Sequence, residues 1–184
     1  MNTLLLSLKE LIPIKFLYTD LKNFLYLIIN YKYLIIILKF FQNYQNLRFR
    51  VLSTISCTDF PELLNRFELT YILMSIDWPF IINIKMKVSE FINIDSSSFL
   101  YKSAVWLERE IWDMFGVYFS NNLDLRRILT DYGFPYHPLR KTFPLQGYME
   151  VHFNLKVKNV YYIKILLSQA KPLKNLVTPW LNLI

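Results

Sequence analysis

The chain of 184 residues has few of the residues from which most cofactor sites are built. Its single cysteine, Cys57, excludes an intramolecular disulfide and cannot supply the four thiolates of an iron–sulfur cluster. The three glycines are isolated, so the sequence has neither a dinucleotide-binding fingerprint nor a phosphate-binding loop. His137 and His152 lack metal-ligand spacing to each other or to Cys57. We therefore expect that the chain binds no flavin, nicotinamide or redox metal and contains no catalytic residue.

The sequence also lacks a long uncharged apolar run of the kind that crosses a membrane. A membrane-spanning helix needs about 20 largely uncharged residues. The most apolar stretch, Phe24–Phe41, contains Asn30 and two lysines, Lys32 and Lys39. An integral membrane protein is therefore an alternative interpretation and not the favoured one.

Aromatic residues are abundant, with 15 Phe and 13 Tyr against only 3 Gly. The abundant residues have A/T-rich codons and the scarce ones have G/C-rich codons, a skew that no folding requirement explains. It indicates a genome under strong A/T pressure, such as that of an organelle. Residues 1–25 contain Glu10 and Asp20, no Arg and no small-residue cleavage site, so they do not resemble a targeting segment. We expect an organelle protein of this kind to be encoded and made where it works.

The net charge of +7 is spread along the chain. Its densest basic groups are the pairs Arg126–Arg127 and Arg140–Lys141. A nucleic-acid-binding surface needs a continuous basic stripe with stacking aromatics. Scattered lysines on a solvated surface explain the charge more simply, and a basic ribosomal or RNA-binding protein is the alternative function.

Hydrophobic periodicity predicts an α/β fold. Strands are expected at 24–29, 47–55, 67–74 and 80–88, and helices at Leu4–Leu11 and from Tyr33 to Phe41. The last two strands flank Asp77-Trp78-Pro79 and should form an antiparallel hairpin, with Asn83, Lys85 and Lys87 on a wet face. The predicted fold is a small mixed, largely antiparallel sheet of about four strands with flanking helices, followed by an extended C-terminal tail.

A helix is expected over 103–115, with Ser103 as its N-cap and Gly116 as its stop. Beyond Gly116, prolines and glycines punctuate a stretch with little periodicity, while its aromatic residues argue against disorder. We therefore divide the chain into an α/β domain, 1–116, and an extended segment, 117–184, that lies across a partner protein.

The helix at 103–115 carries the densest polar chemistry of the chain. Leu107, Ile111, Met114 and Phe115 form its apolar stripe, and Arg109, Glu110 and Asp113 lie on the opposite arc. An Arg109–Asp113 ion pair facing solvent is the simpler interpretation, and an acid/base site is the alternative.

Four ordered blocks of the chain resemble a known family. They are Trp106–Val117, Asp124–Phe134, His137–Leu145 and Gly147–Val151, with weaker matches at Asp59–Pro61, Arg66–Tyr71 and Thr178–Trp180. These blocks are similar to the NuoC-like subunits of the peripheral arm of complex I, called NADH dehydrogenase subunit nine in mitochondrial genomes. Asn121-Asn122-Leu123 replaces a Gly-His-Pro-like turn of the family, and Asn also favours a turn.

The resemblance implies an α/β domain whose extended C-terminal segment wraps a neighbouring core subunit on the matrix side of the mitochondrial inner membrane. The subunit would bind no cofactor or nucleic acid and would meet the membrane only through the complex. Its partners, the quinone-cavity subunit and the iron–sulfur subunits, would carry electrons from NADH through FMN and iron–sulfur clusters to ubiquinone, coupled to proton translocation.

The same resemblance leads to a structural hypothesis for the charged residues. They would form ion pairs that hold the C-terminal segment and its partner, because Arg binds carboxylates bidentately. The signature residues assigned to this subunit-interface role are Glu108, Arg109, Glu110, Asp113, Arg126, Arg127, Asp131, His137 and Arg140.

Overall fold

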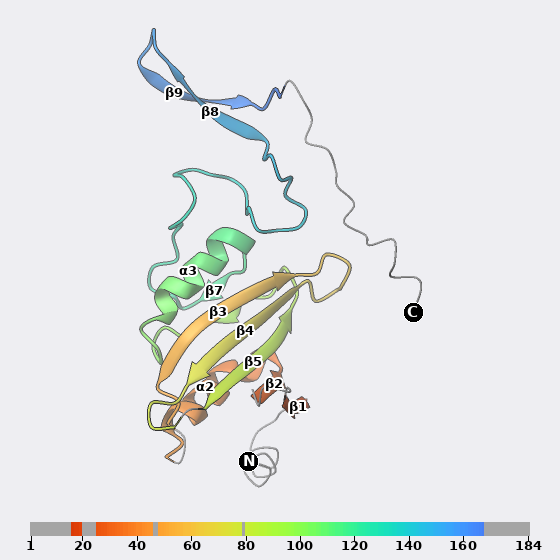
Figure 1. Cartoon of the computed structure of the whole chain (residues 1–184), viewed down its shortest axis with the longest axis vertical. Helices are drawn as coiled ribbons and strands as arrows, with labels where there is room; N and C mark the ends of the chain where they lie inside the picture. The colour runs from red at the N-terminus through yellow and green to blue at the C-terminus, as the bar shows by residue number, and fades with distance from the viewer. Residues whose placement is uncertain (1–15, 20–24, 46–47, 79, 168–184) are drawn as a thin grey trace. The chain divides into compact units, whose positions relative to one another are not determined.

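The computed structural model describes residues 16–19, 25–45, 48–78 and 80–167. The chain divides into two compact units, 1–143 and 144–184, and each is described by itself (Figure 1). The expected helix Leu4–Leu11 and the block Thr178–Trp180 lie outside the described residues. Within the described ranges no helix is long and apolar enough to cross a membrane.

The centre of the first unit is a mixed sheet. Within the described residues its strands are β1 (Phe16–Thr19), β2 (Leu25–Ile29), β3 (Val51–Asp59), β4 (Phe67–Met74) and β5 (Ile81–Val88), in the order β1-β2-β5-β4-β3. Only β2 and β5 pair in parallel; the other neighbours are antiparallel. The predicted α/β class and largely antiparallel sheet are confirmed, and β1 is a further strand that the sequence did not predict.

Buried apolar residues alternate with more exposed ones along β4, and this pattern forms one buried face of the sheet. In β4 the buried residues are Phe67, Leu69, Tyr71 and Leu73, and their β5 partners are Val88, Met86, Ile84 and Ile82. Directly paired residues point to the same side of a sheet, so these rows form one apolar surface. The predicted hairpin is confirmed. Asn83, expected on the wet face, is instead buried at 6% exposure.

Two helices complete the core. After a short 3-10 turn, η1 (Tyr31–Tyr33), helix α2 (Leu34–Asn43) buries Leu34, Ile37, Leu38 and Phe41. Helix α3 (Ala104–Phe115) contributes Ala104 and Ile111 to the same hydrophobic cluster. Both predicted helices, from Tyr33 and over 103–115, are confirmed in place.

The ends of two elements differ from the sequence-based expectation. Strand β3 starts at Val51 and not at residue 47, because Arg48 has a positive φ of 42° and Phe49 is buried against Phe41. Ser103 precedes α3 but does not cap it with its side chain; its hydroxyl donates to the Leu52 carbonyl (3.2 Å). Gly116 ends α3 as predicted, with a left-handed φ of 77°.

Residues 117–143, which the sequence-based division assigned to the extended segment, belong by their contacts to the first unit. There β7 (Phe119–Ser120) pairs in parallel with β6 (Ile94–Asp95). The second unit contains an antiparallel hairpin of β8 (Met149–Asn154) and β9 (Asn159–Lys164). The sequence analysis predicted no strands in this segment, so the hairpin is a further feature of the expected tail.

Candidate functional site

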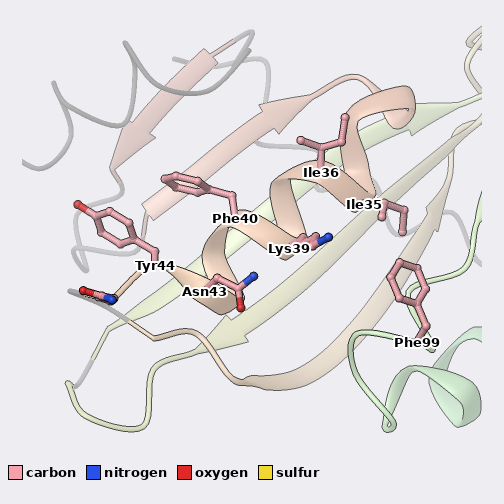
Figure 2. Close-up of a pocket in the computed structure, with 8 residues that line it drawn as sticks. Ile35, Ile36, Lys39, Phe40, Asn43, Tyr44 and Phe99 are labelled. Carbon is pink, nitrogen blue, oxygen red and sulfur yellow. The ribbon is translucent and has the colours of Figure 1, made fainter.

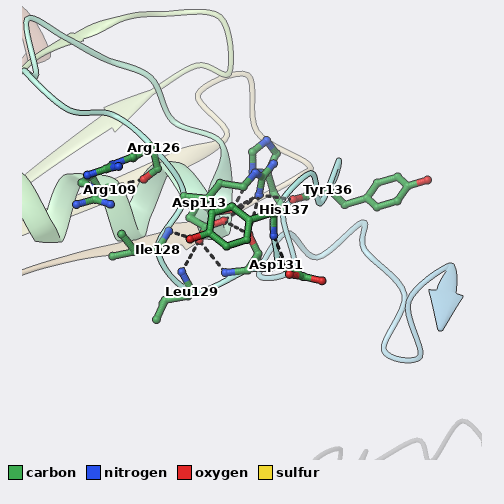
Figure 3. Close-up of polar contacts among 11 residues, drawn as sticks. Arg109, Asp113, Arg126, Ile128, Leu129, Asp131, Tyr136 and His137 are labelled. Atoms are coloured by element: carbon green, nitrogen blue, oxygen red, sulfur yellow. Dashed lines mark hydrogen bonds and ion pairs between the residues drawn. The ribbon is translucent and has the colours of Figure 1, made fainter. Parts of the chain in front are cut away.

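The signature residues gather where α3 meets the segment 121–143, which we call the strap. At the centre is Asp113, which is fully buried in the last turn of α3. Its Oδ2 accepts the backbone N–H groups of Ile128 (3.1 Å), Leu129 (2.8 Å) and Thr130 (3.0 Å) (Figure 3). Its Oδ1 accepts the Thr130 hydroxyl (2.6 Å) and Arg127 Nη1 (2.8 Å). One buried carboxylate therefore accepts hydrogen bonds from four consecutive residues of the strap, 127–130, and fixes their conformation.

These hydrogen-bond donors stabilise the ionised form of Asp113. Burial alone would raise its pKa, but the hydrogen bonds from Thr130 and from the backbone lower it below the ordinary value of 3.8. A general acid or base needs a pKa near the working pH, so Asp113 is unsuited to either role. It is a permanently ionised anchor of the strap.

Arg127 and His137 extend this anchor. Arg127 Nη1 also donates to the Tyr136 carbonyl (2.9 Å), and its guanidinium lies over the Trp112 ring at 5.3 Å. His137 Nδ1 lies 2.9 Å from the Asp113 carbonyl (Figure 3), and since a carbonyl only accepts, Nδ1 carries the proton. Burial lowers the pKa of His137, so the ring is neutral at pH 7. Both side chains therefore hold backbone carbonyl groups, Arg127 that of Tyr136 and His137 that of Asp113.

Glu108 is a second fully buried carboxylate of α3. It accepts the Ser96 hydroxyl (2.5 Å), the Ser97 N–H and hydroxyl (both 2.7 Å) and the Asn122 side-chain amide (2.9 Å). The turn expected at Asn121-Asn122 is present, with Asn121 at a φ of 63°. Asn122 thus joins the start of the strap to α3.

The expected Arg109–Asp113 ion pair on a solvated helix face is wrong. Arg109 is 6% exposed and stacks on Trp106 at 4.8 Å, and its Nε donates to the Arg126 carbonyl (3.1 Å). The strap covers this arc of α3, so its charges find partners there and not along the helix. Glu110 is exposed as expected, and Arg126 pairs with Asp124 at the surface (2.9 Å).

A further ion-pair network fastens the end of the strap to the sheet. Arg66 holds Asp59 through two bonds (2.7 and 3.0 Å) and also reaches Glu90 (3.1 Å). Arg140 pairs with the other Glu90 oxygen and donates to the Phe115 carbonyl. The Lys141 N–H donates to Asp59 (2.8 Å). Arg140 was predicted as a site residue, but the other side chains of this network, Asp59, Arg66 and Glu90, were not.

The signal for these missed partners was weak. Asp59 and Arg66 lie in blocks that matched the family only weakly, and no spacing rule links them to Arg140. Asp131 is exposed, and its Oδ1 accepts the N–H of Tyr132 (2.8 Å). Its predicted role at an interface stays a prediction.

The strap also approaches the end of α3 very closely. A Cβ added at Gly116 would lie 2.5 Å from Arg140 Nη2 and 2.6 Å from the His137 ring. In the part of the chain that the structure describes, no group of three or more His, Cys, Asp or Glu could hold a metal ion. The arrangement therefore defines a class: a two-layer α/β domain with a strap fastened by buried carboxylates and arginines.

Comparisons with known proteins identify the family. The sequence matches the family described as the respiratory-chain NADH dehydrogenase, 30 Kd subunit, over residues 27–149. It is 44% identical to NADH-ubiquinone oxidoreductase subunit 9 of Reclinomonas americana over 147 residues, covering 80% of this chain and 72% of that protein. It is 50% identical to the protein of the same name from Acanthamoeba castellanii, covering 72% and 67%.

A solved structure shares the fold. A chain of the membrane-bound sulfane sulfur reductase, an archaeal respiratory membrane complex, superposes with a TM-score of 0.68 and 21% identity, covering 78% of this chain and 85% of that one. The chain described here belongs to the family of 30 kDa subunits of respiratory-chain NADH dehydrogenase. The predicted family is confirmed, and the comparisons favour it over a ribosomal or RNA-binding protein.

Proposed function

We propose that the chain is a structural subunit of the peripheral arm of mitochondrial NADH–ubiquinone oxidoreductase, on the matrix side of the inner membrane. In this proposal it binds no cofactor and no nucleic acid and is encoded in the mitochondrial genome. FMN, the iron–sulfur clusters and the binding sites for NADH and ubiquinone belong to partner subunits, and the assembled complex couples electron transfer to proton translocation. Family membership and the single cysteine support this role.

An exposed apolar face of the β8–β9 hairpin carries the proposal. Cross-strand partners point to the same side of the ladder. Met149, Val151 and Phe153 therefore share one face with Lys164, Tyr162 and Val160, whereas Glu150, His152 and Asn154 lie on the other. Val151 is 59% and Phe153 51% exposed. A two-stranded hairpin is at best marginally stable alone in water, so we infer that this face docks on a partner subunit.

The strap supplies the geometry for that docking. Two ion pairs, Asp113 with Arg127 and Glu90 with Arg140, lie within the first unit and hold residues of the strap on the α/β domain. In this proposal the partner-wrapping segment, 117–184, comprises the residues held on the α/β domain and the second unit, 144–184, which contains the hairpin. We propose the quinone-cavity subunit and the iron–sulfur subunits as the partners.

A native-gel separation of mitochondrial complexes, with this chain located by mass spectrometry, tests the role. We expect it to migrate with NADH–ubiquinone oxidoreductase and to leave the membrane on alkaline carbonate extraction when expressed alone. Migration with ribosomes would favour the RNA-binding alternative. Resistance to extraction of the chain expressed alone would favour an integral membrane protein.

A pair of substitutions on opposite faces of the hairpin tests the docking surface. Phe153→Asp puts a charge on the apolar face, and Asn154→Asp adds the same charge to the other face while keeping the acceptor for the Lys156 N–H (2.9 Å). Burying a Phe side chain contributes about 1.5–3 kcal/mol, so Phe153→Asp should weaken docking about 10- to 100-fold. The amount of assembled complex should fall for Phe153→Asp only. Equal assembly of both variants would refute docking through this face.

A further inference from the structure

A second surface of the first unit has the character of a binding site. A hollow of about 770 Å³ lies along the outward side of α2, between that helix and the loop that precedes α3 (Figure 2). Its walls include Ile35, Ile36 and Phe40 of the helix and Phe99 of the loop. Ile36 is 64% and Phe99 69% exposed. Phe40 is half-buried and also packs against the core, whereas Ile36 and Phe99 are large apolar side chains exposed over the hollow.

The core does not require these residues. Helix α2 already buries its own apolar stripe of Leu34, Ile37, Leu38 and Phe41. A helix with one covered face normally carries polar residues on the other, whereas α2 exposes Ile36 beside Lys39 and Asn43, and an exposed apolar patch of this kind indicates a binding surface. The two walls of the hollow are also tied together, because Gln42 Nε2 donates to the Leu100 carbonyl (2.9 Å). The hollow is therefore a preformed feature of this fold.

The charge around the hollow has one sign. Lys39 lines it, and Asn43 and Gln45 also line an adjoining polar hollow with Arg48 and Arg50. The sequence has no Asp or Glu between Asp20 and Asp59. Arg48 Nη1 forms an ion pair with Asp77 Oδ2 at 3.6 Å, and both side chains are about half exposed. A bound molecule whose carboxylates lie beside Lys39 and Arg50 would be attracted to these cations, and because both are exposed the cost of desolvating the charges would be small.

We propose that this hollow binds a segment of a partner protein that combines apolar side chains with acidic ones. The apolar side chains would pack against Ile36 and Phe99, and the acidic ones would lie beside Lys39 and Arg50. The amide side chains of Asn43 and Gln45 can donate to and accept from a peptide backbone, which favours a protein segment over a lipid tail. The hollow is lined by residues other than those of the hairpin face and the strap, so the inference goes beyond the proposed function.

Photocrosslinking in the assembled complex tests the occupant directly. A photoreactive phenylalanine analogue replaces Ile36, the complex is isolated and irradiated, and the crosslinked peptide is identified by mass spectrometry. We expect one segment of another protein, with apolar residues and a net negative charge. A product with lipid alone, with this chain itself or with a neutral or basic segment overturns the inference, and so does the absence of any product.

A charge series at Lys39 provides the matched control. Lys39 is exposed, so Lys39→Arg, Lys39→Gln and Lys39→Glu should all fold. The crosslink yield should persist in Lys39→Arg and fall in Lys39→Gln and further in Lys39→Glu, by about two- to fivefold for a rim charge. An unchanged yield in Lys39→Glu overturns the inference. Because assembly is scored on the same samples by native gel, an assembled complex without the crosslink refutes this site and leaves the proposed function standing.

Discussion

Replacing Asp113 by Asn is the most direct perturbation of the strap. The substitution keeps the shape of the side chain and one acceptor oxygen but removes the charge and turns the other oxygen into a donor. If the remaining oxygen faces the N–H groups of residues 128–130, the new amide faces Arg127 Nη1, now 2.8 Å from an acceptor. If the amide is reversed, it faces three N–H donors instead. Neither orientation satisfies all the donors that now converge on Asp113.

The cost follows from this geometry. Removing one partner of a buried ion pair typically costs about 3–5 kcal/mol. Since Asn retains one acceptor, we expect the lower end, about 3 kcal/mol, out of a total domain stability of about 5–15 kcal/mol. For a chain of this size that loss lowers the unfolding midpoint by about 6–12 °C. The amides of Ile128, Leu129 and Thr130 should exchange about 100-fold faster, because the strap opens before the sheet does.

Urea unfolding and hydrogen exchange of the full chain measure these effects. Glu110→Gln is the matched control, because it makes the same carboxylate-to-amide change on the same helix at an exposed side chain. The control should change the free energy of unfolding by less than about 0.5 kcal/mol. If Asp113→Asn costs less than about 1 kcal/mol and leaves the exchange of residues 128–130 unchanged, Asp113 does not organise the strap.

Three further outcomes follow from buried groups of the first unit. The Tyr71 hydroxyl is buried with no hydrogen-bond partner among the described residues; Tyr71→Phe should therefore leave the free energy of unfolding in urea unchanged or raise it by about 1–2 kcal/mol, and a clear loss would contradict this. Burial raises the pKa of the Cys57 thiol to about 12, so iodoacetamide at pH 8 should label it only after unfolding, and rapid labelling of the folded chain would contradict this. At Asp59, Glu90 and Asp113, burial raises the pKa but arginine, threonine and backbone donors outweigh it and lower the pKa below 3.8, 4.5 and 3.8. The unfolded chain then takes up protons first, so the free energy of unfolding in urea should decrease as the pH falls below about 4.5; constant stability down to pH 3 would refute the ionised networks.

Local patterns in the sequence determined much of the α/β domain. Period-two alternation predicts β4 and β5 and their hairpin, and 3.6-residue spacing predicts α2 and α3. Gly116 predicts the end of α3, since only glycine takes a left-handed φ without strain. The ordered blocks from Trp106 to Val151 were enough to predict the family. These features depend on neighbours along the chain, which a sequence displays directly.

The same kind of signal was present in the hairpin and was overlooked. Met149, Val151 and Phe153 alternate with Glu150, His152 and Asn154, which is a strand pattern. The prolines and glycines before it dominated the interpretation of the tail. The two strands of the hairpin are therefore a local feature that the sequence itself displays.

Only the tertiary structure decided where the charges go. Helical spacing places Arg109 and Asp113 on the same arc of α3 whether water or the strap covers that arc. The spacing of residues within a helix carries no information about a segment that lies about 15 residues further along the chain. The strap makes Asp113 the acceptor for residues 127–130, and Glu108 accepts from Asn122 of the strap and from Ser96 and Ser97 of the loop before α3. It also brings Arg140 to Glu90, 50 positions earlier in the chain. Such pairings need a chain reversal that brings the two residues together. They also need burial, because a buried charge costs free energy unless it has a partner. Both conditions are met only when the whole unit has folded.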